Sequence, residues 1–191
     1  LDHYAGAGIE NILALGGDPP ADGSPVTGDF TYAAELLEVV RAHPARFSVA
    51  VAAHPEVHPR SPDRESDRRH LVAKLAEADF AMTQFFFEVE HYVRLVDELA
   101  ALGCDKPVLP GVMPFVSVAG VRRMAAMNAA HIPDALQARL DAADGDPEAV
   151  RRLGVEVATE LCQQLIEVGV PGLHLYALNR SESVREVVSA L

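Results

Sequence analysis

The sequence predicts an α/β fold in which a parallel sheet forms part of a (β/α)8 TIM barrel. Short aliphatic runs alternate with amphipathic helical segments five times along the 191 residues, which is the pattern of βα units. The runs are apolar throughout, as parallel strands buried beneath helices are. No phosphate-binding glycine motif follows any run, which disfavours an open nucleotide-binding sheet. Since a complete barrel takes about 250 residues, we expect an incomplete barrel of about five βα units that lacks the N-terminal strands.

The first element along the chain is the last turn of a helix, because residues 1–8 end in a glycine that can stop one. The chain begins at Leu1, so we expect a fragment of a longer protein. Turn residues bound each of the aliphatic runs that follow. The five predicted strands are 9–15, 47–53, 80–87, 107–113 and 172–178.

Between the strands, apolar residues recur at i, i+3, i+4 and i+7, the spacing of one face of a helix. These stripes lie at 33–40, 89–96 and 184–191, and residues 132–143 predict a short additional helix. A longer helix is expected to begin with Asp146 as N-cap and Pro147 at the first helical position, with an apolar stripe that runs to Leu165. All of these elements fit a single domain over 1–191.

Composition restricts the classes of partner. The formal charge of −12, from 16 Lys and Arg against 28 Asp and Glu, argues against nucleic acid and anionic membrane surfaces. Cys104 and Cys162 have no neighbouring cysteine, so neither a disulfide framework nor a structural zinc site is expected, and a reducing cytoplasm fits best. No apolar run approaches the roughly 20 residues of a membrane span. No N-terminal leader is evident either.

In barrels of this kind the chemistry lies at the carboxyl ends of the strands. The residues that follow the five runs are therefore the candidates for a site. Their polar members, expected to converge on one rim, are Asp18, His54, Glu56, His58, Gln84, Asn179 and Arg180.

Two of these strand ends allow more than one interpretation. Asp18 lies between two glycines and two prolines, so its carboxylate either caps a turn or stabilises a cation that develops on a substrate. His54, Glu56 and His58 are residue types that bind zinc or iron, although the neighbouring prolines make the segment an extended loop. The loop could hold a metal, lie against a cofactor, or carry solvated histidines.

The next predicted helix has Asp67, His70 and Lys74 at i, i+3 and i+7, on one face. This face is either solvated or covered by a phosphate-bearing cofactor. In the second case Lys74 suits a diphosphate and Asp67 suits a ribose hydroxyl.

Gln84 offers a donor and an acceptor to a planar heterocycle, such as a pterin or a nicotinamide amide. The three phenylalanines that follow it could form core or a platform for a ring. Arg180 either caps the last helix or binds a substrate carboxylate.

Five segments, in this order, resemble the methylenetetrahydrofolate reductase family: ILALGGDPP (12–20), AAHPEVHP (52–59), ADFAMTQFFF (78–87), PGVMPF (110–115) and GLHLYALNR (172–180). The resemblance runs the length of the chain and implies the last five βα units of that family's barrel. It implies a cytoplasmic flavoprotein oxidoreductase of one-carbon and methionine metabolism, and a homo-oligomer. In the family, FAD takes a hydride from NADH or NADPH and passes it to 5,10-methylenetetrahydrofolate, giving 5-methyltetrahydrofolate.

The resemblance also implies roles for individual residues. Asp18 and Gln84 would be catalytic, and both would bind the folate together with Arg180. The residues implied to bind FAD are Gly17, Asp18, Tyr32, Ala33, His54, His58, Asp67, His70 and Lys74.

The chain departs from the family pattern at four positions. Gly16 replaces an arginine, Ala73 replaces a frequent basic residue, and Gly120 and Met124 stand where some members have a folate-contacting Gln and Phe. The family's catalytic glutamate belongs to the first strand, so we expect the fragment alone to be unstable and inactive. A non-catalytic folate or flavin binder and a metal-dependent barrel hydrolase remain as alternatives.

Overall fold

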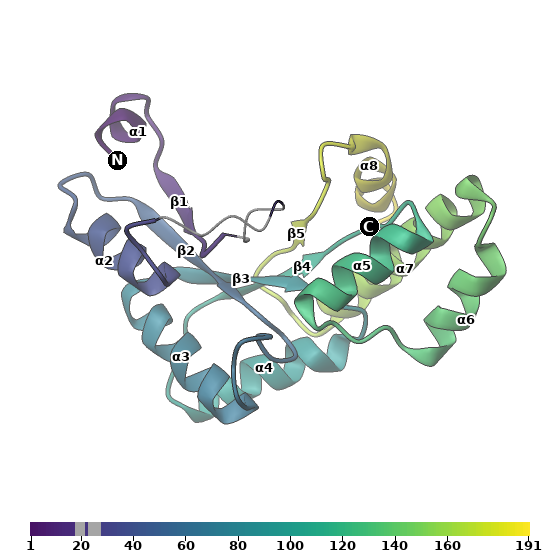
Figure 1. The fold of residues 1–191 in the computed structure, drawn as a ribbon, viewed down its shortest axis with the longest axis horizontal. Coiled ribbons are helices and arrows are strands. Elements are labelled where there is room, and N and C mark those ends of the chain that lie inside the picture. Colours follow the sequence, from purple (N-terminus) through teal and green to yellow (C-terminus); the bar gives the residue numbers. More distant parts are fainter. Residues whose placement is uncertain (18–21, 23–27) are drawn as a thin grey trace.

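The computed structural model describes residues 1–17, 22 and 28–191, and within them five parallel strands form one sheet in the order β1-β2-β3-β4-β5. The strands curve into about half of a barrel (Figure 1), which confirms the predicted fold class. The strands are β1 (Asn11–Ala14), β2 (Ser48–Ala53), β3 (Phe80–Phe85), β4 (Val108–Val112) and β5 (His174–Leu175). The helices of the described part are α1 (Asp2–Gly6), α2 (Ala33–Ala42), α3 (Arg64–Glu77), α4 (Val89–Ala101), α5 (Val118–Asn128), α6 (Asp134–Ala143), α7 (Pro147–Glu167) and α8 (Ser181–Ser189).

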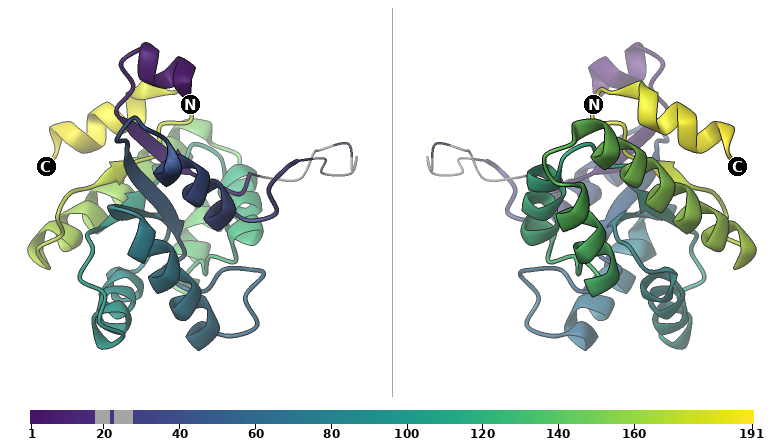
Figure 2. Two further views of the ribbon diagram at one scale, coloured as in Figure 1. Left: turned by 90° about the vertical axis from the view of Figure 1, so that its left-hand side faces the viewer. Right: turned by 90° about the vertical axis from the view of Figure 1, so that its right-hand side faces the viewer.

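The main core lies between the sheet and the helices that cover its outer face. Val49 and Val51 of β2 pack there with leucines of α2, α3, α4 and α7, so the aliphatic runs form strands because each supplies apolar side chains to this layer. Helices α2, α3 and α4 lie along one side of the sheet in Figure 1. Helices α1 and α8, from opposite ends of the chain, lie apart along the long axis of the molecule (Figure 1), although both lie towards the upper edge in the views of Figure 2.

The inner face of the sheet is covered less completely than the outer one. In β3, Phe80, Met82 and Gln84 are half-buried whereas the alternate residues are fully buried. In β1, Asn11 is exposed and Leu13 is 39% exposed. The prediction that every strand is buried on both faces is therefore wrong for β1, because β1 is an edge strand whose inner face has few neighbours. β5 is also shorter than predicted, with two residues.

The predicted start of the long helix is confirmed. Asp146 is the N-cap of α7, and its carboxylate accepts hydrogen bonds from the backbone N–H groups of Glu148 and Ala149, each at 3.1 Å. Pro147 occupies the first turn, and the apolar stripe that ends at Leu165 faces the core. Residues 134–143 form the predicted short helix α6.

The predicted stripe of α4 packs against the core except at Val93. Tyr92, Leu95 and Leu99 are buried, whereas Val93, which belongs to the predicted stripe, is 36% exposed. The Tyr92 hydroxyl donates a hydrogen bond of 2.9 Å to the carbonyl oxygen of Val108, which fixes this orientation against β4. In α8 only part of the predicted stripe is buried, because Val188 is 56% exposed.

A second, smaller core joins the end of β4 to α5, α6 and α7. Phe115, Val121, Leu140 and Leu153 pack in it. Gly154 allows the close approach, since a Cβ at this position would lie 1.9 Å from the carbonyl oxygen of Phe115. This contact holds the segment after β4 where it can line a cleft.

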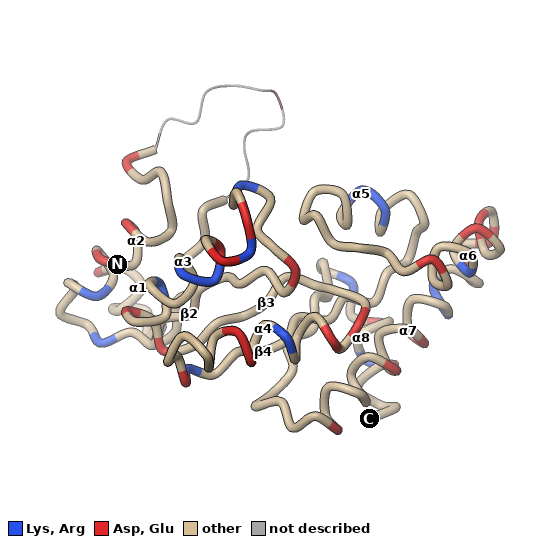
Figure 3. Tube along the Cα trace, turned by 90° about the horizontal axis from the view of Figure 1, so that it is seen from below, with Lys and Arg blue, Asp and Glu red and all other residues tan. Residues whose placement is uncertain are grey.

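Acidic positions occur along most of the trace, with basic positions between them (Figure 3). Cys104 and Cys162 are both free cysteines. Within the described residues no helix has both the length and the hydropathy needed to cross a bilayer.

Candidate functional site

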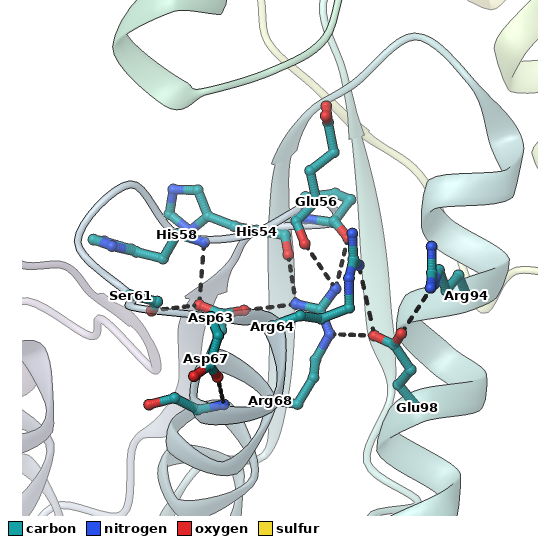
Figure 4. A network of polar contacts seen from close by, with 12 residues as sticks. His54, Glu56, His58, Ser61, Asp63, Arg64, Asp67, Arg68, Arg94 and Glu98 are labelled. Carbon is teal, nitrogen blue, oxygen red and sulfur yellow. Dashed lines mark hydrogen bonds and ion pairs between the residues drawn. The ribbon is translucent and has the colours of Figure 1, made fainter.

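The site is built at the carboxyl ends of β2 and β3, where the structure brings several of the predicted residues together. The segment after β2 carries His54 and His58, and α3 follows it with Asp67 and Lys74. Asp63 caps the start of α3 by accepting a hydrogen bond of 2.7 Å from the Ser66 backbone N–H. This cap is at the start of α3, which lies directly beneath the loop of residues 54–58, here called the histidine loop (Figure 4).

The two histidines form a pair. Their ring centroids lie 4.4 Å apart in an edge-to-face arrangement. Burial, followed by the charge of His58, lowers the pKa of His54 to about 4. Burial, followed by the charge of Arg60, also lowers the pKa of His58. Both rings therefore remain neutral at physiological pH and can act as hydrogen-bonding or stacking groups.

Lys74 reaches the end of β2. Its Nζ donates a hydrogen bond of 2.9 Å to the carbonyl oxygen of Ala52 and keeps two further donors. Burial lowers its pKa, and the charge of Asp67 opposes this effect. His70, on the same helix, is exposed, so the predicted face of α3 is solvated at His70 and buried at Asp67.

The Asp67 carboxylate has several partners within the chain. Its Oδ1 accepts hydrogen bonds from the His58 backbone N–H at 3.1 Å and from the Ser61 hydroxyl at 3.0 Å. Its Oδ2 accepts one from Arg68 at 2.6 Å. Asp67 therefore holds the histidine loop, which the sequence analysis did not anticipate.

Arg68 is a functional candidate that the sequence analysis missed. Its side chain is 2% exposed and it contacts the loop after β2 as well as Glu98 of α4. A charged residue on a helix is usually solvated, and the only signal in the sequence is its position next to Asp67. Only the fold shows that it is buried.

Gln84, the residue before the last of β3, lies at an irregularity in the sheet. The register between β3 and β4 shifts between Met82 and Phe85, as at a β-bulge, and bulges commonly redirect side chains next to sites. Thr83 accepts a hydrogen bond of 2.8 Å at its Oγ1 from the Gly111 backbone N–H, and its carbonyl oxygen accepts one of 2.8 Å from the Tyr176 hydroxyl. No hydrogen bond joins the Gln84 amide to another described residue, so its donor and acceptor remain available.

A cleft of about 340 Å³ lies between α5 and the segment that links β5 to α8. Arg180, Gly120 and Met124 line it, so three positions that the resemblance associated with folate lie together. Leu178 and Asn179 have φ values of 46° and 61°, an uncommon conformation for residues other than glycine and one that concentrates at functional sites. This strained turn brings Arg180 to the cleft, where its side chain makes no capping hydrogen bond to α8.

Two of the remaining cofactor candidates, Tyr32 and Ala33, lie at the start of α2. Tyr32 is 58% exposed and the Arg60 guanidinium lies 5.6 Å from its ring centroid, while Ala33 is the first residue of α2. Gly17 has a φ of 72°, which favours glycine. Asp18, predicted to be catalytic, lies outside the described residues.

The loop residues that were considered as metal ligands do not converge. The Glu56 carboxylate accepts hydrogen bonds from the His131 backbone N–H at 2.9 and 3.1 Å, and in Figure 4 it extends away from the rings of His54 and His58. Among the described residues, no group of three His, Cys, Asp or Glu side chains is arranged to hold a metal ion.

Comparisons with known proteins agree on one family. A family model described as methylenetetrahydrofolate reductase matches residues 1–191. Methylenetetrahydrofolate reductase 2 of Saccharomyces cerevisiae is 35% identical over 199 residues, covering 100% of this chain and 33% of that protein. The 5,10-methylenetetrahydrofolate reductase of Pectobacterium carotovorum is 36% identical over 180 residues, covering 94% of this chain and 59% of that protein. The chain thus spans between 33% and 59% of the length of these relatives.

A solved structure has the same fold. It is described as an uncharacterized protein from Clostridium thermocellum that binds two copies of 5-methyl-5,6,7,8-tetrahydrofolic acid, and it superposes with a TM-score of 0.58 at 14% identity. The match covers 95% of this chain and 71% of that one. From the family match over its whole length and the identity to its relatives, the chain belongs to the methylenetetrahydrofolate reductase family.

Proposed function

We propose that this chain is the C-terminal portion of the catalytic barrel of a methylenetetrahydrofolate reductase, over 1–191 as one domain. The protein that carries it would reduce 5,10-methylenetetrahydrofolate to 5-methyltetrahydrofolate with NADH or NADPH, in one-carbon metabolism. The observation that carries the proposal is the convergence of His54, His58 and Lys74 at the end of β2, beside Gln84 at the end of β3. Because the chain belongs to the methylenetetrahydrofolate reductase family, we interpret these residues as part of its cofactor and substrate site.

The residues at this strand end fit FAD. Lys74 is a partly buried cation with two unused donors, which suits a diphosphate. His54 and His58 present neutral rings that can pack against or hydrogen-bond to the cofactor. Asp67 is already engaged by His58, Ser61 and Arg68, so a contact with the ribose would use its remaining lone pairs. Gly17, Tyr32, Ala33 and His70 remain predicted contacts.

When bound, FAD supplies a two-electron carrier between the nicotinamide donor and the folate. Gln84 would orient each substrate ring in turn through its free amide, and Arg180 would pair with a folate carboxylate across the cleft. The Asp18 carboxylate would stabilise the positive charge that develops on the folate before hydride arrives. We further expect a cytoplasmic homo-oligomer, as the resemblance implies.

The test uses the purified full-length protein. We expect flavin absorption that bleaches on addition of NADH or NADPH and returns on addition of 5,10-methylenetetrahydrofolate. A protein that retains flavin but is bleached by neither nicotinamide would contradict the proposal. Absence of flavin after reconstitution with excess FAD would contradict it too.

A folate binder without turnover is the second candidate, and Gly120 favours it. This glycine lines the cleft where some family members carry a glutamine, and a Cβ there would lie 2.5 Å from the Ser117 Oγ that caps α5. The cleft therefore offers no amide at this position. Equilibrium binding of 5-methyltetrahydrofolate without hydride transfer would support this candidate over the reductase.

A further inference from the structure

One buried guanidinium holds the loop that carries both histidines. Arg68 Nη1 donates to the carbonyl oxygen of His54 at 3.0 Å, and Nη2 donates to those of Pro55 at 2.7 Å and Glu56 at 3.0 Å. Nη1 also reaches Asp67 Oδ2 at 2.6 Å, and Nε reaches Glu98 Oε2 at 2.7 Å. All five N–H donors of Arg68 are thus used.

Three of these acceptors are consecutive backbone carbonyls, which is why the arrangement determines a loop conformation. A planar guanidinium with fixed donor directions can satisfy them only if the peptide groups of 54–56 keep their mutual orientation. A lysine ammonium in the same place has three donors and no plane, so it would leave carbonyl groups unpaired. The loop shape therefore depends on an arginine at position 68.

The charge of Arg68 is balanced on two sides. Asp67 lies at its loop side and Glu98 of α4 at the other, and Glu98 is itself held by Arg94 at 3.0 Å. The side chain is 2% exposed, so this compensation is needed for a buried cation to be tolerated. The ion pair between Arg68 of α3 and Glu98 of α4 also links the loop to both helices.

The positions of His54 and His58 depend on the Arg68 hydrogen bonds through the backbone of the loop. Arg68 binds the carbonyl of His54 directly, and its partner Asp67 accepts the N–H of His58. In Figure 4 the guanidinium lies against the loop backbone while the two imidazoles extend away from it. Arg68 therefore contributes to where both rings lie without contacting either of them.

We propose that Arg68 is a positioning residue of the cofactor site, which fixes the 54–58 loop so that His54 and His58 are presented to a bound flavin. The proposal rests on the proposed function for the identity of the ligand. It assigns to Arg68 no contact with FAD and no step of the reaction. Its effect is on the affinity of the site, through the orientation of the two rings.

The test is Arg68→Lys in the full-length protein, with Arg41→Lys as a matched control. Arg41 also donates to two backbone carbonyls, those of Phe47 and Glu77, and pairs with Asp79 at 3.0 Å, but it does so at the opposite, amino end of β2. FAD affinity is measured by fluorescence titration, and the ring signals of the histidines are followed by NMR without FAD. Circular dichroism reports folding of each variant.

We expect Arg68→Lys to weaken FAD binding by roughly tenfold or more and to shift the ring signals of His54 and His58. Arg41→Lys should leave both readouts near those of the unmodified protein. Folded Arg68→Lys with unchanged affinity and unchanged signals would overturn the proposal, as would an equal loss of affinity in Arg41→Lys.

A second variant covers the case in which Arg68→Lys does not fold. Glu98→Ala removes one partner of Arg68 from α4, away from the loop, and should weaken FAD binding in the same direction but less. Unchanged histidine signals and affinity in this variant would refute the positioning role. If the unmodified protein binds no FAD, the proposed function fails, while the histidine signals still test whether Arg68 orients the loop.

Discussion

Acid should destabilise this protein through His54 in a defined pH window. The pKa of His54 falls from 6.5 to about 4, chiefly because burial disfavours the charged ring, with further contributions from His58, Lys74 and Arg68 against an opposing one from Asp67. As pH falls below about 6.5, the unfolded chain takes up a proton that the folded protein does not. Stability is therefore lost as pH falls towards about 4.

The magnitude follows from the shift. One pKa unit corresponds to about 1.4 kcal/mol, so His54 should account for up to about 3 kcal/mol of unfolding free energy lost across this window. The assay is urea denaturation followed by circular dichroism at several pH values, on the unmodified protein and on His54→Phe. The variant cannot titrate at this position, so the stability difference between the two proteins should change by about this amount.

Comparing the unmodified protein with His54→Phe also cancels the effects of acid on other titratable groups. Asp79 and Glu98 have lowered pKa values because of hydrogen bonds and nearby arginines that outweigh burial, and they lose stabilisation in acid in both proteins alike. A stability difference that stays constant from about pH 7 to about pH 4 would refute the assignment of a buried, neutral His54.

Three further predictions concern packing and the reaction. Gly154→Ala should cost about 1–3 kcal/mol of unfolding free energy in denaturation experiments because its Cβ would overlap Phe115, whereas Gly6→Ala, at a helical glycine with open space, should cost nothing; equal effects would contradict this close packing. Leu165→Ala should cost about 2–5 kcal/mol, since the side chain is fully buried against the sheet, and a thermal melt that does not move would argue against this core. Asp18→Asn should slow reoxidation by the folate more than reduction by the nicotinamide in stopped-flow experiments, and equal slowing would remove its assigned role.

Much of the fold could be predicted because its signals are local. Asp146, Pro147 and the apolar stripe to Leu165 predicted α7, and the five aliphatic runs predicted the parallel strands in their order. The strand ends also pointed to His54 and His58, which lie together at the end of β2 with Lys74 of the predicted α3 face nearby, while the roles of these residues stay predictions. These predictions succeeded because turn residues and periodicity act over a few residues.

The predictions that were wrong concern which side chains of a helix or strand face the core. The predicted stripe of α4 included Val93, which is 36% exposed, because the hydrogen bond from the Tyr92 hydroxyl to the carbonyl oxygen of Val108 on β4 turns the buried face towards Tyr92. The exposure of Leu13 follows from the edge position of β1. Neither contact partner is close in sequence, so periodicity alone could not identify them.

The sequence by itself determined the order of strands and helices, the aliphatic core and the family, since each is carried by patterns of neighbouring residues. Only the tertiary structure decided that Asp67 holds a loop and that Arg68 is buried beneath His54 with every donor satisfied. The physical reason is that burial of a charge depends on acceptors from separate segments, here the loop after β2 and Glu98 of α4, meeting at one point in space.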